Sequence, residues 1–146
     1  MADYYCLTSF EITKDKNFPI QDFVNIINSY EMENINIAPK WFQEKYNVFD
    51  FGYHGPLDIK YKIENDNLWI CSELHFDTET ISKIIQAILI QYDLDTYITF
   101  QIALTCNKPR IDSFSGMGVF ITKEAISTCD ISDWVNLKIK EYQAKK

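Results

Sequence analysis

The chain has 146 residues, of which 47% are hydrophobic and 15% aromatic, and its formal net charge is −7. This length fits a single domain, 1–146, and the composition excludes a disordered chain and one that needs disulfides or metals to form a core. The acidic balance excludes a broad nucleic-acid-binding face, because contacts with phosphate groups need clustered Lys or Arg side chains.

The N-terminal part of the chain has an extended pattern followed by a helical one. Apolar and polar side chains alternate over residues 4–12, which predicts a strand. Residues 19–31 are predicted to form a helix, because Pro19 suits a first helical turn and apolar residues recur there at helical spacing.

A long, acidic and aromatic connecting segment, 32–56, comes next. Residues 39–46 are predicted to form one or two helical turns that carry Trp41 and Phe42. A connection of this length is unusual in a compact domain and is often functional. Two interpretations remain open: the aromatic side chains cover the core, or Trp41 and Phe42 are anchors for a partner.

The middle of the chain is predicted to form a hairpin and a helix. Strands over 57–64 and 68–76 flank the turn residues 65–67. The pattern over 78–92 is the clearest helix, capped by Asp77 or Thr78. Its buried stripe is predicted to contain Ile81, Ile84, Ile85, Ile88 and Tyr92.

The last third is predicted to contain two paired strands, 96–106 and 117–123, and a final helix, 131–143. Asp130 would cap this helix, and Trp134 and Val135 would point inward.

The resulting order, β-α-β-β-α-β-β-α, predicts an α+β fold with a mainly antiparallel sheet. Its first six elements match a ferredoxin-like split βαβ core, β-α-β-β-α-β, extended by a further strand and a C-terminal helix. Both helices of that core would cover one face. The other face is half apolar, so we expect the 32–56 segment, the last helix or a partner to cover it. It would carry Tyr5, Leu7, Trp69, Cys71, Tyr97, Gln101 and Ala103.

The loop 107–116 between two predicted strands is the main candidate site. It is longer than a plain hairpin needs and holds the only arginine of the chain. The loop contains two basic side chains, two hydroxyls and a glycine, which lets backbone amides approach a ligand. These residues are Lys108, Arg110, Ser113, Ser115 and Gly116. Either the loop binds a partner or a small anion, or Arg110 pairs with a nearby acid and the glycines permit a bulge.

The sequence favours neither a catalytic nor a metal site. His54 and His75 are isolated, and Cys71 and His75 lie too far apart along one strand to share a metal directly. Motifs for nucleophilic or metal-dependent hydrolysis are absent, and so is a nucleotide-binding glycine motif. We therefore expect no enzyme activity, no metal and no cofactor.

The cysteines and the apolar runs indicate the compartment. The four cysteines are widely spaced without a CxxC pair, which favours reduced thiols in the cytoplasm. No apolar run approaches the length of a membrane span, and the N-terminus lacks a secretory pattern, so no membrane contact is expected.

At TCNKPRIDSFSGMGVFIT the chain resembles a family of small uncharacterised proteins of phages and other mobile bacterial elements. That family shows the motif TCxKPRxxxFxGG before an apolar stretch, and Met117 stands where its second glycine is usual. The similarity extends to the opening YY…SFEI, the LWI strand and the helix before the motif. The matching positions are Thr105, Cys106, Lys108, Pro109, Arg110, Phe114, Gly116 and Gly118.

The resemblance implies that the chain binds and inhibits a host or defence protein. The predicted contact consists of the 32–56 segment and the loop 107–116, with acidic surface steering a basic partner, and the chain itself a monomer or homodimer. Two alternatives stay open: a module that sequesters a small anion or nucleotide, and an immunity protein against a toxin.

Overall fold

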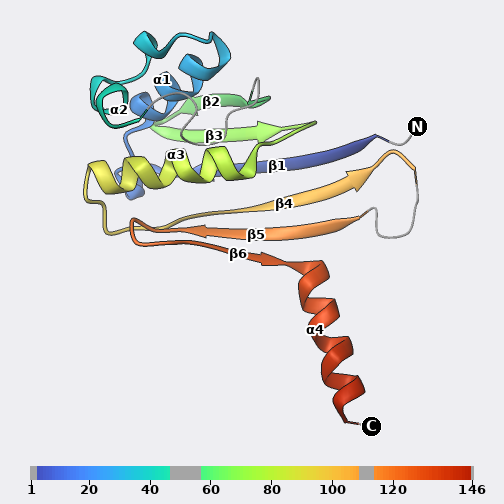
Figure 1. The fold of residues 1–146 in the computed structure, drawn as a ribbon. Coiled ribbons are helices and arrows are strands. Elements are labelled where there is room, and N and C mark those ends of the chain that lie inside the picture. The colour runs from blue at the N-terminus through green and yellow to red at the C-terminus, as the bar shows by residue number, and fades with distance from the viewer. Residues whose placement is uncertain (1–2, 47–56, 109–113, 146) are drawn as a thin grey trace.

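The computed structural model describes residues 3–46, 57–108 and 114–145 (Figure 1). In these ranges the fold is α+β, with one antiparallel six-stranded sheet and four α-helices. The predicted fold class and the mainly antiparallel sheet are confirmed.

Neighbouring strands of the sheet pair antiparallel throughout the order β2-β3-β1-β4-β5-β6. The strands are β1 (Tyr4–Ile12), β2 (Lys60–Glu64), β3 (Asn67–Ser72), β4 (Ile98–Cys106), β5 (Ser115–Ile121) and β6 (Ile126–Asp130). The helices are α1 (Ile20–Glu31), α2 (Lys40–Lys45), α3 (Thr78–Gln91) and α4 (Ile131–Ala144), with short 3₁₀ turns η1 (Lys14–Lys16) and η2 (Ile35–Ile37).

Strands β5 and β6 continue the sheet beyond β4. The order of the six strands therefore differs from the four-stranded ferredoxin-like pattern, and that finer assignment stays an interpretation. Strand β6 was not predicted from the sequence. Its five residues, ISTCD, carry one large apolar side chain, so their alternation is too weak to indicate a strand.

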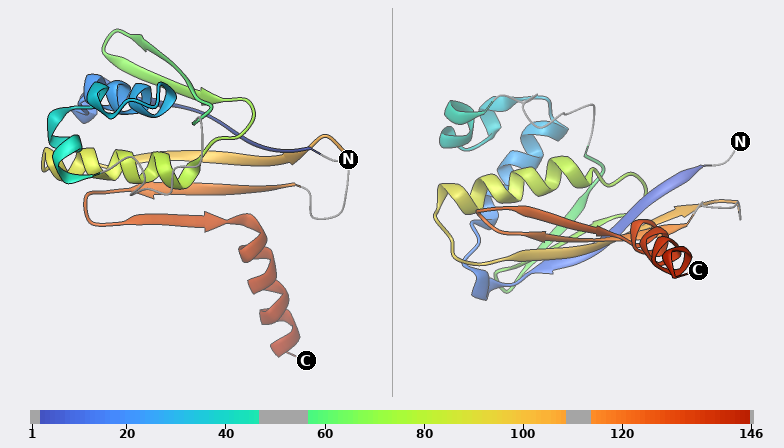
Figure 2. Two further views of the ribbon diagram at one scale, coloured as in Figure 1. Left: turned by 45° about the horizontal axis from the view of Figure 1, so that its top comes forward. Right: turned by 60° about the horizontal axis from the view of Figure 1, so that its bottom comes forward.

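The core lies between one face of the sheet and the helices α1 and α3, which Figure 2 shows on the same side. Phe100 of β4 stacks on Phe10 with ring centroids 4.5 Å apart and meets Phe76 edge-on at 5.6 Å. Such aromatic clusters bury large apolar areas and prefer these offset and edge-on arrangements.

Helix α3 supplies much of the apolar surface above the sheet. Its predicted stripe is confirmed for the four isoleucines, Ile81, Ile84, Ile85 and Ile88, which are fully buried. Tyr92 is the exception. It lies just after the helix and is 45% exposed, because its hydroxyl reaches sideways to the carboxylate of Asp22 on α1.

The predicted helix caps are confirmed at both strand-to-helix junctions. The Asp77 carboxylate accepts a hydrogen bond from the Thr80 amide at 3.0 Å, and that of Asp130 accepts one from the Ser132 amide at 2.7 Å. Each bond satisfies a backbone amide that the first helical turn leaves without a partner. Because Asp130 ends β6 and Ile131 begins α4, no linker separates the last strand from the last helix.

Candidate binding surfaces

The loop 107–116 is only partly described by the structure. Lys108 is exposed, whereas Arg110 and Ser113 lie outside the described residues. Ser115 and Gly116 belong to β5, and both contact the start of α4. The Ser115 and Ser132 hydroxyls are 3.0 Å apart, and a Cβ built on Gly116 would lie 2.9 Å from Cδ1 of Ile131. In this structure these two residues therefore support a helix rather than line an open anion site.

Trp41 and Phe42 lie on α2, on the helical side of the molecule. Phe42 is fully buried in the core, so its side chain is not presented to a partner. The indole of Trp41 is half-buried and donates a hydrogen bond to Asp22 at 2.9 Å. The structure thus places these aromatics as cover for the core, which was one of the two interpretations of the 32–56 segment. Residues 47–56 of that segment lie outside the described residues.

Neither Cys6 nor Cys71 has the environment of a reactive thiol. The Cys6 sulfur lies 3.9 Å from the Thr78 hydroxyl, and burial raises the pKa of the Cys6 thiol. Burial also raises the pKa of Cys71. His75 is exposed, its ring stacks near Tyr5, and its backbone amide donates to Asp58. A raised pKa keeps a thiol protonated, which is the opposite of what a nucleophile needs.

His54 lies outside the described residues, as does the candidate arginine. Within the described ranges, no three His, Cys, Asp or Glu side chains gather in a way that could hold a metal ion. In the same ranges, no helix has the length and apolar character needed to cross a bilayer.

The face of the sheet turned away from α1 and α3 is the first extended surface that could bind a partner, and we call it the open face. A shallow hollow lies at its centre where β1 and β4 pair, with Leu7 opposite Ala103. The hollow is present because the side chains of Ser9 and Ala103 are small and project little from the sheet. The hollow is lined by Leu7, Thr8, Ser9, Gln101, Ile102 and Ala103.

Aromatic side chains flank this hollow on the open face. Trp69 of β3 is 40% exposed, and its indole N–H donates to the Ser9 hydroxyl at 2.9 Å, which holds the ring at the rim. At the far end, Tyr97 and Phe120 stack with centroids 5.2 Å apart and are both close to half exposed. The described parts of the 32–56 segment and α4 leave Trp69 and Phe120 exposed on this face.

Helix α4 carries the second extended surface. None of its side chains is buried, and Figures 1 and 2 show it projecting away from the sheet beyond β6. The inward positions predicted for Trp134 and Val135 are wrong: these side chains are 56% and 42% exposed. Without a linker after β6, the helix has no residues that could turn it back over the sheet.

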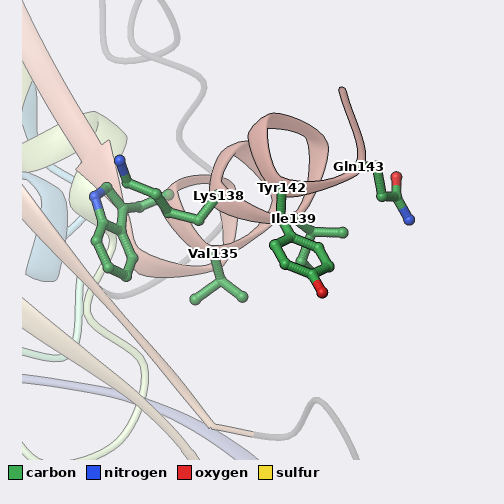
Figure 3. Close-up of a pocket in the computed structure, with 6 residues that line it drawn as sticks. Val135, Lys138, Ile139, Tyr142 and Gln143 are labelled. Atoms are coloured by element: carbon green, nitrogen blue, oxygen red, sulfur yellow. The ribbon is translucent and has the colours of Figure 1, made fainter. Parts of the chain in front are cut away.

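The exposed side chains of α4 follow helical spacing and form what we call the apolar stripe. In Figure 3, Val135, Ile139 and Tyr142 project from the same side of the helix. The ammonium of Lys138 lies over the Trp134 ring at 5.9 Å from its centroid. The stripe comprises Ile131, Trp134, Val135, Ile139 and Tyr142. A stripe of this kind normally faces a packed neighbour.

Comparison with family models, with curated proteins and with solved structures gives no match for this chain. The two surfaces and the chemistry of their side chains are therefore the basis for assigning a function.

Proposed function

We propose that this protein is a non-enzymatic binding protein that acts by stoichiometric contact with another protein. The observation that carries this proposal is the open face. It combines a central hollow beside Ala103 with the partly exposed indole of Trp69, and the described residues leave it uncovered. Contiguous exposed apolar surface of this kind marks interaction sites in folded proteins.

Trp69 is the proposed anchor of the contact. Its ring is already held by the hydrogen bond to Ser9, so binding costs little side-chain entropy. The hollow between Leu7 and Ala103 has room for a partner's side chain. Exposed tryptophan beside a pocket that becomes dry on binding is a frequent composition of binding hot spots.

The proposed partner is a basic protein. The net charge of −7 favours encounter with a basic surface, because electrostatic complementarity raises association rates. From the family resemblance, we propose that the chain is phage or mobile-element encoded and that the partner is a host or defence protein. The same contact would serve an immunity protein, whose partner would be a toxin.

Two finer assignments belong with this proposal. We interpret β1, α1, β2, β3, α3 and β4 as a ferredoxin-like split βαβ core to which β5, β6 and α4 are added. We also keep Lys108 and Arg110 as a secondary contact or a small-anion site, because Lys108 is exposed at the end of the sheet where β4 finishes.

The test is affinity capture from host lysate with three baits: wild-type protein, Ala103→Arg and the control Gln21→Arg. Ala103→Arg fills the hollow with a charged side chain, whereas Gln21 is exposed on α1, in the other layer. We expect wild-type and control baits to capture one basic protein in near-stoichiometric amount, and Ala103→Arg to lose it.

Calorimetry with the purified partner then gives the affinity of each variant, and circular dichroism checks that each is folded. Equal capture by all three baits would rule out the open face as the contact. If no protein is captured by any bait, and millimolar nucleotides raise the Tm, the anion-binding alternative replaces this proposal.

A further inference from the structure

The two edges of the sheet are built differently. Edge strand β2 is charged: Lys62 pairs with Glu64 at 3.4 Å, and Lys60 pairs with Glu73 at 3.7 Å. Edge strand β6 has the sequence ISTCD, whose single charge, Asp130, is engaged as the α4 cap. Natural proteins protect exposed edges with charges, lysine above all, against pairing with another strand. The β2 edge has this protection and the β6 edge lacks it.

The hydrogen bond in the turn before β6 shows which backbone groups of β6 face outward. The Thr122 amide donates to the Ala125 carbonyl at 2.9 Å, which makes these two residues a hydrogen-bonded pair. Bonded and non-bonded pairs alternate along an antiparallel ladder. The amide and carbonyl of Thr128 therefore point away from β5, and no other described strand lies on that side.

We propose that β6 pairs antiparallel with β6 of a second copy of this chain, about a twofold axis. Antiparallel pairing of a strand with itself sets the end of one β6 beside the beginning of the other. Helix α4, which starts at the end of β6, then lies beside the partner's turn 122–125. Figure 1 shows α4 leaving the body past this same edge, where the second copy would be.

The charges at that turn complement the lysines at the C-terminal end of α4. The turn presents Glu124, which is exposed, and the adjacent carboxylates of Asp93 and Asp95, whose side chains are 87% exposed although both pair with Lys123. Helix α4 carries Lys138 and Lys140 beside the acidic Asp133 and Glu141, and Lys145 follows the helix. Lys138 already pairs with Glu141 at 3.0 Å, so the acidic end of one copy would meet Lys140 and Lys145 of the other, twice per dimer.

The apolar groups match as well. The stacked rings of Tyr97 and Phe120 lie beside the turn, and with Leu94 and Thr122 they line a shallow depression. The apolar stripe of α4 starts at Ile131, next to the end of β6. A second copy therefore covers both the stripe and this depression with one contact.

A dimer contact of ordinary size needs α4 as well as β6. A stable interface buries about 800 Å² on each partner, and five paired residues, about 17 Å of strand, supply only part of that. The 14 residues of α4 extend the contact by about 21 Å in each copy. This inference uses neither the hollow on β1 and β4 nor Trp69, so it does not rest on the proposed function, although Tyr97 and Phe120 also lie on the open face.

The test is the mass in solution, measured by light scattering and sedimentation velocity at tens of micromolar protein. We expect twice the 17.2 kDa chain mass for the wild type. Thr128→Pro removes the outward amide without breaking the β5–β6 ladder, and we expect it to be monomeric.

The matched control is Ile63→Pro on the other edge. Its amide also faces outward, because Glu64 and Asn67 flank a two-residue turn, and it should stay dimeric.

A second variant keeps the test informative if proline disturbs β6. Thr128→Lys retains the amide but adds the charge that protects β2, and it should raise the dimer dissociation constant at least tenfold. A monomeric wild type, or an unchanged dimer in both Thr128 variants, would overturn the proposal. Ala103→Arg should remain dimeric, which separates this result from the test of the open face.

Discussion

At the scale of single residues, Phe100 tests where the core lies. Its ring is 3% exposed and contacts Phe10 and Phe76, so truncation leaves a cavity between the sheet and α3. We expect Phe100→Ala to lower the free energy of unfolding by about 3–5 kcal/mol, measured by urea denaturation. Tyr4→Ala is the control and should cost less than about 1 kcal/mol, because that side chain is 57% exposed. Similar losses for both would contradict this placement of the core.

Lys123 provides a pH-dependent prediction. Its ammonium lies 2.7 Å from an Asp93 oxygen and 2.6 Å from an Asp95 oxygen. The hydrogen bond from Lys123 lowers the pKa of Asp93, so this carboxylate stabilises the fold above its unfolded pKa of about 3.9 and loses that effect as the pH falls. We expect Lys123→Met to lower the Tm at pH 7, and the difference from wild type to shrink below about pH 4.

Thermal melts at pH 7, 5 and 3 would check this dependence on Lys123. Lys83→Met is the matched control, because Lys83 pairs with a single carboxylate, Glu79, along the surface of α3. Its effect at pH 7 should be smaller. A difference for Lys123→Met that is independent of pH would show that the Asp93 carboxylate is not the cause.

At the scale of elements, α4 should contribute little to the stability of one copy. It buries none of its side chains, and an isolated helix of this length is marginal in water. In the Thr128→Pro background, truncation after Ser132 keeps the contacts with Ser115 and Gly116. We expect the truncation to lower the free energy of unfolding by less than about 1 kcal/mol, measured by urea denaturation.

The comparison variant is Ile84→Ala in α3, which should lower the free energy of unfolding by about 2–5 kcal/mol in the same background. A comparable loss on truncation would mean that α4 packs on its own chain.

The elements that periodicity predicted are those whose partners lie within the chain. Helix α3 repeats isoleucine at helical spacing, and β4 alternates Ile98, Phe100 and Ile102 with polar residues, so each buries the expected side. Strand β6 was missed because the turn before it, Lys123-Glu124, has no Gly, Asn or Pro. For α4 the helix was predicted, with Trp134 and Val135 on its apolar side, but periodicity shows which side is apolar and not what covers it.

The candidate site was predictable in part for a similar reason. The outward residues of β1, β3 and β4 could be assigned from alternation, which identified Trp69 and Ala103 as members of one face. The hollow itself depends on the register that sets Leu7 opposite Ala103, and sequence alone does not fix register. The composition of the loop around Arg110 predicted a site there. No pattern in the sequence predicts the hollow beside Ser9 and Ala103, which forms only when the strands pair.

At the scale of the whole molecule, the two proposals combine into one arrangement. Antiparallel pairing of β6 about a twofold axis perpendicular to the sheet would continue it across two copies, with both open faces on the same side. A dimer would then present two hollows to its partner. Two linked contacts bind with far higher avidity than one when the partner can engage both.

The same dimer predicts where backbone protection changes. In the wild-type dimer, α4 amides should exchange slowly with deuterium, because the partner's turn and aromatic rings hold the helix in place. In Thr128→Pro the helix loses that support, and a helix of 14 residues without packed neighbours opens readily, so peptides from 131–145 should exchange at nearly the unprotected rate. Peptides from α3 should remain protected in both proteins, since its isoleucines are buried within each copy. Mass spectrometry of exchange would check this, and α4 protection equal in both proteins would mean that contacts within one chain hold the helix.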